Sequence, residues 1–93
     1  MKVYSLLILY AVNTEDSFFK QSLRVFDNRE KALECFEDDI RRHYEEVNYV
    51  IDDDDVKKED RFVSEARKSL CKNNAWCDEN TENTYIIQCL DVE

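Results

Sequence analysis

The sequence predicts an α+β fold in which a small antiparallel sheet is packed on one face by one long and one shorter helix. Three observations carry this prediction. Strand-like apolar runs lie near both ends of the chain, helix-period apolar residues follow the first two runs, and a row of aspartates separates two helical segments. The predicted order of elements is ββααββ. Without a linker or an internal repeat, residues 1–93 are expected to form a single domain.

The first predicted strand covers residues 3–12, where apolar side chains occupy both parities of the two-residue strand period. Such a strand is covered on both faces of a sheet or is paired in a dimer. Residues 18–26 alternate between apolar and polar side chains and predict a half-solvated strand that pairs with the first as a hairpin. In the predicted loop Asn13 replaces glycine, because asparagine tolerates positive φ better than other residues with a Cβ.

A long helix is predicted over residues 27–50. It begins with a capping box, in which Asp27 is followed three residues later by Glu30. One stripe of apolar residues at helical spacing is expected to pack on the sheet: Leu33, Phe36, Ile40, Tyr44 and Val47. The opposite face carries two predicted ion pairs at four-residue spacing: Glu37 with Arg41 and Asp38 with Arg42.

A second helix is predicted over residues 56–70, because acids at an N-terminus attract the partial positive charge and free N–H groups there. Asp54 or Asp55 is the expected cap, and Lys72, Asn73 and Asn74 are expected to supply a basic last turn and an asparagine stop. The buried stripe is expected to comprise Phe62, Val63, Ala66 and Leu70. Short and long strands over residues 75–77 and 84–92 complete the sheet.

The predicted core joins the first helix to residues of three strands. Its expected members are Leu6, Ile8, Leu23, Val25, Leu33, Phe36, Ile40, Ile86 and Leu90.

The chain contains no glycine and no proline, and this absence excludes most named catalytic motifs. Glycine-rich phosphate loops, EF-hand calcium loops and the nucleophile elbow all require glycine at fixed positions. No cofactor is therefore expected, and an enzyme is disfavoured. The apolar run over residues 3–12 is half the length of a membrane-spanning helix and lacks the pattern of a signal peptide, so a cytoplasmic location is expected.

The four cysteines are expected as free thiols in that compartment, because their spacing contains no CxxC. They are Cys35, Cys71, Cys77 and Cys89. A zinc site is disfavoured for the same reason, and because His43, the only histidine, is distant in sequence from three of them.

The net charge of -9 is unevenly distributed. Residues 37–60 carry eleven acids and four bases, whereas residues 61–77 carry one acid and four bases. Direct nucleic-acid binding is disfavoured because phosphate contacts need a basic surface. The expected partner is instead a basic protein surface, of the kind that usually exists to bind DNA or RNA. The alternative is that the acids only solvate the surface and cap helices.

The candidate partner-binding residues are the acids of this region together with one aromatic residue. They are Glu37, Asp38, Glu45, Glu46, Asp52, Asp53, Asp54, Asp55 and Trp76. For Trp76 two roles stay open, because tryptophan serves both as a core residue and as an interface anchor. Asp-x-Asp within the aspartate row can hold a divalent cation, but a helix cap is the simpler role. His43 has an acid on either side at helical spacing, which is a weak indication of a general base.

In its length, acidity and lack of cofactor motifs the chain resembles small proteins of phages and mobile elements. That resemblance implies a stoichiometric inhibitor of a host or defence protein, acting as anti-CRISPR proteins do by covering a nucleic-acid site. Two alternatives come from other classes: a structural or regulatory homodimer, and a small metal-dependent hydrolase that uses Asp52 to Asp55.

Overall fold

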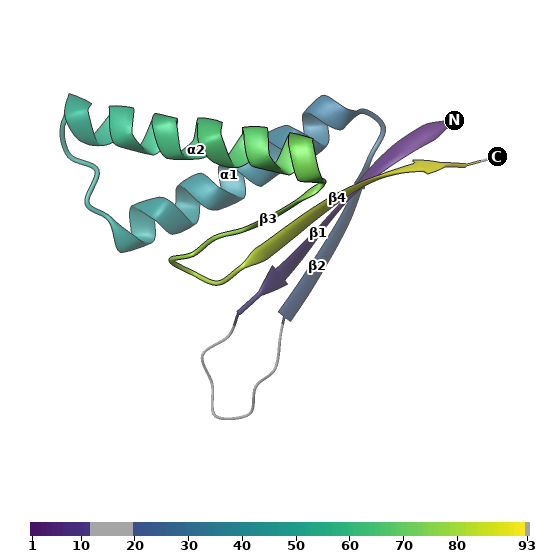
Figure 1. Cartoon of the computed structure of the whole chain (residues 1–93), viewed down its shortest axis with the longest axis horizontal. Coiled ribbons are helices and arrows are strands. Elements are labelled where there is room, and N and C mark those ends of the chain that lie inside the picture. Colours follow the sequence, from purple (N-terminus) through teal and green to yellow (C-terminus); the bar gives the residue numbers. More distant parts are fainter. Residues whose placement is uncertain (12–19, 93) are drawn as a thin grey trace.

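The computed structural model describes residues 1–11 and 20–92, and it has the predicted α+β architecture (Figure 1). The elements follow in the order β1 (Lys2–Tyr10), β2 (Lys20–Phe26), α1 (Arg29–Val47), α2 (Asp53–Asn73), β3 (Ala75–Cys77) and β4 (Thr84–Asp91). The predicted ββααββ order is therefore confirmed. The expected turn at Asn13 and the start of the predicted second strand lie outside the described residues.

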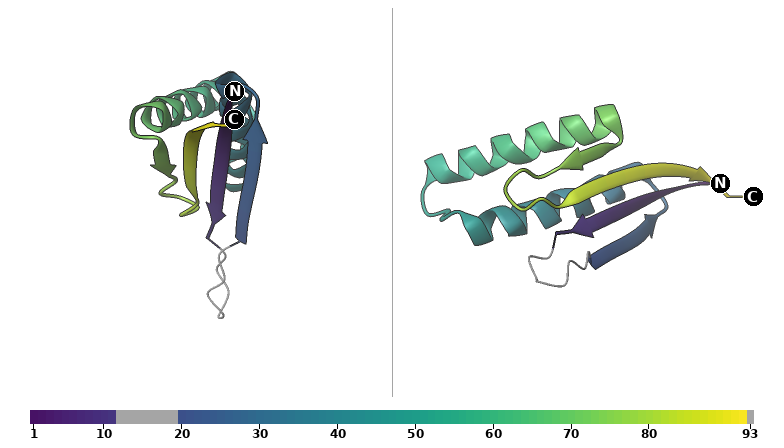
Figure 2. Two further views of the ribbon diagram at one scale, coloured as in Figure 1. Left: turned by 90° about the vertical axis from the view of Figure 1, so that its right-hand side faces the viewer. Right: turned by 60° about the horizontal axis from the view of Figure 1, so that its bottom comes forward.

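The four strands form one antiparallel sheet whose spatial order, β2-β1-β4-β3, differs from the chain order. β1 is central and pairs with β2 on one side and with β4 on the other. The two ends of the chain meet, because Val92 donates its backbone N–H to the carbonyl of Met1 at 2.7 Å. Both helices lie on the same side of the sheet, and no other described element covers the opposite side (Figure 2).

The first helix is shorter than predicted at both ends. Asn28 is its N-cap, and the side-chain oxygen of Asn28 accepts from the backbone N–H of Lys31 at 2.8 Å. The predicted cap, Asp27, instead forms a 3.0 Å ion pair with Lys31. The helix ends at Asn48, which leaves the helical region and donates its backbone N–H to Tyr44. The prediction of a capping box at Asp27 was wrong by one residue, because asparagine competes equally well for that position.

The second helix is longer than predicted and begins within the aspartate row. Its N-cap is Asp52 rather than Asp54 or Asp55. The predicted asparagine stop is confirmed, and the structure places it at Asn74, which has φ 61° and ψ 8° and whose N–H bonds to the carbonyl of Leu70. Asparagine supplies the left-handed cap that glycine usually provides. The buried residues Val63, Ala66 and Leu70 confirm most of the predicted stripe, while Phe62 is half-buried.

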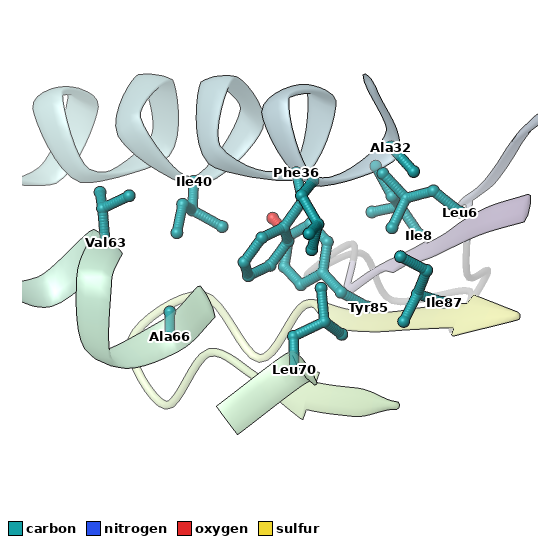
Figure 3. Close-up of a cluster of buried hydrophobic side chains, with 11 residues drawn as sticks. Leu6, Ile8, Ala32, Phe36, Ile40, Val63, Ala66, Leu70, Tyr85 and Ile87 are labelled. Carbon is teal, nitrogen blue, oxygen red and sulfur yellow. The ribbon is translucent and has the colours of Figure 1, made fainter. Parts of the chain in front are cut away.

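The core lies between the two helices and the covered face of the sheet (Figure 3). Phe36 is fully buried at its centre and packs edge to face on the Tyr85 ring, with the ring centroids 5.0 Å apart. The other fully or almost fully buried apolar residues are Leu6, Ile8, Ala32, Leu33, Ile40, Val63, Ala66, Leu70 and Ile87. Five of the predicted core residues are confirmed by this set: Leu6, Ile8, Leu33, Phe36 and Ile40.

The remaining predicted core residues face away from the helices, and their assignment to the core was wrong. Leu23, Val25 and Leu90 are 64%, 59% and 42% exposed. Because side chains alternate along a strand, the pairing of Leu23 with Leu7 places both on the uncovered side. We call this side the open face. Its strand positions are Val3, Ser5, Leu7, Leu9, Gln21, Leu23, Val25, Ala75, Cys77, Thr84, Ile86, Gln88 and Leu90.

Ion pairs join the two helices across their interface, and within α1 Arg42 pairs with Asp39 at 2.7 Å. Arg41 bonds to Asp60 of α2 at 2.8 Å, and Glu37 accepts from Arg67 of α2 at the same distance. The predicted pairs of Glu37 with Arg41 and of Asp38 with Arg42 therefore do not form. A neighbouring helix offers carboxylates and guanidinium groups already held in place by packing, whereas an exposed pair within one helix gains little.

Candidate functional site

The loop between the helices concentrates the acids that the sequence singled out. We define the hairpin tip as residues 45–56, which span the end of α1, the connection and the first turn of α2. The tip lies at the end of the molecule opposite both chain termini (Figure 1). It contains six acids and no lysine or arginine, so it is the most negative segment of the chain.

Two of the six acids hold the tip in shape. Asp52 accepts the backbone N–H of Asp55 at 2.9 Å, and Asp55 accepts the N–H groups of Ile51 at 3.2 Å and of Asp52 at 3.5 Å. These bonds form a reciprocal capping box. The N–H groups of Ile51 and Asp52 also lower the pKa of the Asp55 carboxyl below its ordinary value, because they stabilise its charged form. Asp52 and Asp55 therefore have a structural role.

The other acids of the tip flank exposed apolar side chains in the sequence. Tyr49 and Ile51 are 89% and 84% exposed, and Val47 on the last turn of α1 is 62% exposed. Glu45, Glu46, Asp53 and Asp54 are exposed nearby in the chain. The sequence showed the apolar stretch around Tyr49, but composition alone did not reveal that it faces solvent. Its position in the sequence could have indicated this exposure. An apolar segment that connects two helices and belongs to no helix or strand has no sheet face to pack on.

The other two acids predicted for this surface lie elsewhere on α1. Glu37 is half-buried against α2, where its bond to Arg67 raises the pKa of that guanidinium. Asp38 is exposed and lines a pocket on the sheet side of the helix. Both precede Glu46 by eight or nine residues, or roughly 12 Å along the helix axis. The predicted acidic surface thus divides into the hairpin tip and two separate positions.

Trp76 is a member of the core aromatic cluster. Its ring packs on Phe36 and Phe62 with centroids 5.7 Å away in both cases, and on Tyr85 at 5.8 Å. Phe62, on which Trp76 packs, lies six residues after Val56, the last residue of the tip, or roughly 9 Å along α2. Of the two roles that the sequence left open, the structure places this side chain in packing and away from the acids.

A buried carboxylate, Asp39, connects α1 to the sheet and was not predicted as a site. Its side chain accepts hydrogen bonds from the hydroxyl groups of Tyr85 at 2.7 Å and Tyr10 at 3.0 Å, and from Arg42 at 2.7 Å. Burial raises the pKa of the Tyr85 hydroxyl well above its usual range, and the bond to Asp39 adds to this shift. Each hydroxyl is therefore held neutral as a donor, which makes the network a fixed structural link.

His43 belongs to the border of the same network. Its Nδ1 lies 2.8 Å from the backbone oxygen of Asp39, and its ring packs 5.8 Å from that of Tyr10. The first of its two predicted acidic neighbours is thus present. A nitrogen engaged with a carbonyl oxygen is a donor and cannot accept a substrate proton, which argues against a general base at Nδ1.

A pocket of about 400 Å³ opens between α1 and the first two strands. Its charged lining is balanced, with three basic residues, Arg24, Lys31 and Arg42, and three acidic ones, Glu34, Asp38 and Asp39. Lys31 and Arg42 already bond to carboxylates, and Arg24 lies 3.8 Å from the sulfur of Cys35. A pocket with no net charge and with paired side chains selects no particular ion.

The described residues contain neither a cluster of metal ligands nor a membrane-spanning helix. Over residues 1–11 and 20–92, no three side chains among histidine, cysteine and the acids gather closely enough to hold a metal ion. In the same part of the chain, no helix is both long and apolar enough to cross a bilayer. Cys77 and Cys89 are exposed free thiols, whereas Cys35 and Cys71 are half-buried.

Comparison with known proteins does not assign the chain to a group: no family model, no curated protein and no solved structure matches it.

Proposed function

We propose that the chain is a non-enzymatic binding protein that docks its hairpin tip on a basic, partly apolar surface of another protein. The observation that carries this proposal is the composition of the tip. Six acids and no base flank Tyr49 and Ile51 in the sequence, and these two residues are 89% and 84% exposed. An aromatic anchor ringed by polar groups is typical of the centre of a protein interface.

The charge of the tip favours a positive partner. Long-range attraction between an acidic surface and a basic groove increases the association rate, whereas phosphate groups would be repelled. Positive grooves usually exist to bind DNA or RNA. The proposed partner is therefore a nucleic-acid-handling protein of the cytoplasm, and occupation of its groove inhibits it, in the manner of the anti-CRISPR proteins of phages.

The proposal is tested with two variants that lose the same charge from different places. The tip variant carries Glu45→Gln, Glu46→Gln, Asp53→Asn and Asp54→Asn and keeps Asp52 and Asp55, which cap the helix. The control variant neutralises four exposed acids outside the tip: Glu34→Gln, Glu65→Gln, Glu79→Gln and Asp91→Asn. Equal net charge separates an effect of position from an effect of total charge.

Proteins retained from a lysate of the native host by the immobilised wild-type chain are identified by mass spectrometry and purified for kinetics. At 50 mM salt the tip variant should associate about tenfold more slowly than the wild type, with a flatter salt dependence. The control variant should associate at nearly the wild-type rate. Addition of nucleic acid should compete with the wild-type chain for the partner.

A second substitution tests the apolar part of the tip. Tyr49→Ala should increase the dissociation rate constant at least about thirtyfold while leaving the fold intact, because an anchor acts after encounter. Equal binding by the wild type, the tip variant and Tyr49→Ala would overturn the proposal. Binding that nucleic acid does not compete with would also overturn the inhibitory role.

A further inference from the structure

The open face of the sheet has the character of a subunit interface. Of its described strand positions none carries a charged residue, although 38% of the residues in the chain are charged. Antiparallel sheets that face water normally present polar side chains on that side. Here Leu23 and Val25 remain 64% and 59% exposed, and such uncharged apolar surfaces mark sites of association.

One apolar row crosses the entire open face. The strand register places Leu23 of β2 beside Leu7 of β1, Leu7 beside Ile86 of β4, and Ile86 beside Ala75 of β3. The neighbouring rows mix apolar and uncharged polar residues, such as Ser5 beside Gln88. A complementary partner therefore needs a matching apolar row with short polar groups on either side.

A second copy of the chain has the same apolar row with the same polar groups on either side. We propose that two copies pack open face to open face as a two-fold symmetric dimer. With the two-fold axis along the apolar row, each residue of the row lies opposite its own counterpart in the partner subunit. Antiparallel sheets packed in this way form an aligned sandwich whose inner side chains interdigitate.

The distribution of charge removes the main obstacle to such self-association. Each chain has a net charge of -9, but its helices lie on the far side of the sheet. Sheets packed about 10 Å apart, each with an outer helix layer, separate the two helix layers by roughly 30 Å. That distance is several Debye lengths of about 8 Å at physiological salt, so repulsion between the acidic layers is largely screened. A charged partner, in contrast, would find no complementary charge on this face.

The area of the face is sufficient for a small interface. The strands β1, β2, β3 and β4 contain nine, seven, three and eight residues. At about 3.3 Å per residue and about 4.8 Å between strands, they give a flat area of roughly 430 Å². The relief of the side chains increases the accessible area toward the roughly 600–800 Å² that each partner buries in specific complexes.

Sedimentation equilibrium over a range of concentrations tests the dimer. The wild-type chain should show twice the 11.2 kDa chain mass at high concentration. Leu23→Lys should increase the dimer dissociation constant at least about 100-fold, because two lysines would face each other across the axis. Val47→Lys is the matched control, since Val47 is 62% exposed but belongs to the hairpin tip, and it should leave the dimer unchanged.

Two further measurements keep the result interpretable. Val25→Lys, on the same edge strand, should also give a monomer, and far-ultraviolet circular dichroism should show the wild-type fold for both lysine variants. Mixing Leu23→Lys with Leu23→Glu should restore the mass of a dimer through opposite charges at the axis. A wild-type chain that stays at 11.2 kDa up to millimolar concentration, or a dimer that persists in both lysine variants, would falsify the proposal. Failure of the mixture to dimerise would overturn the proposed position of the axis.

Discussion

The two faces of the sheet use the same strands in opposite ways. On the covered face, Leu6 and Ile8 of β1 are buried under α1, and the polar groups there form the closed network around Asp39. On the open face, Leu7 and its neighbours are uncharged and remain accessible. The covered face determines the stability of the single chain, whereas the open face contributes little to it and is available for association. Substitutions of similar size should therefore have different effects on the two faces.

The largest difference is expected between Phe36→Ala and Leu23→Ala. Phe36 is fully buried among aromatic rings, so its truncation leaves a cavity and should decrease the free energy of unfolding by about 3–5 kcal/mol. Leu23→Ala should decrease it by about 1 kcal/mol or less, because most of that side chain already contacts water. Urea denaturation at concentrations that favour the monomer measures both values. Equal losses for the two variants would show that the faces do not differ.

A smaller effect on the covered face is expected for Tyr85→Phe. The Tyr85 hydroxyl is buried and donates to Asp39, so its removal should decrease the free energy of unfolding by about 1.5–3 kcal/mol. Tyr10→Phe removes the other tyrosine donor, but Tyr10 is only half-buried and water can replace its hydroxyl. Its loss should be smaller, and thermal unfolding of the two variants side by side gives the comparison. A larger loss for Tyr10→Phe would contradict the burial of this network.

The hairpin tip provides a third comparison, between acids that cap and acids that only add charge. Asp52→Ala removes the acceptor for the Asp55 N–H and should decrease the free energy of unfolding by about 1 kcal/mol. Asp53→Ala removes the same charge from the next residue but no cap, and should have an effect near zero. Chemical denaturation of both variants at one ionic strength makes the measurement. If the two losses are the same, Asp52 acts by its charge and not by its hydrogen bond.

The smallest effect concerns Glu59, the buried carboxyl of α2 that faces α1. Burial raises the pKa of Glu59 above its ordinary value, and the nearby charge of Glu45 raises it further. Between the unfolded and the raised folded pKa the folded state binds more protons, so stability falls as pH rises through this window. One side-chain oxygen of Glu59 is also buried without a hydrogen-bond partner among residues 1–11 and 20–92.

Glu59→Gln should therefore stabilise the chain by up to about 1 kcal/mol at pH 7, because it removes the buried charge. The advantage should disappear as pH falls below about 4, where the carboxyl is protonated in both states. Free energies of unfolding measured from pH 3.5 to 7.5 give the two curves. A wild-type chain more stable than Glu59→Gln at pH 7 would show that the ion pair with Arg41, at 3.9 Å, outweighs the burial of Glu59.

The candidate site could be predicted only in part. The acidic composition of residues 45–55 could be predicted directly, but which of these acids cap α2 and which stay exposed could not. Whether Asp52 or Asp54 caps the helix depends on where the preceding chain leaves α1, and that helix ends at Val47, three residues before its predicted end at residue 50. Trp76 could not be assigned from composition, because its surroundings come from three separate elements, α1, α2 and β4, whose packing brings their rings together.

The sequence by itself determined the α+β class, the order of the six elements and the asparagine stop of the second helix. Each depends on local periodicity or on the backbone preference of one residue type. Only the tertiary structure decided which side of the sheet the helices cover. β1 is apolar at both parities, so its pattern is compatible with either side, and the register with β2 and β4 then fixes Leu23, Ile86 and Leu90 on the open face. The partners of Arg41 and Arg67 were likewise decided by packing, since ion pairs between helices depend on how two distant segments meet.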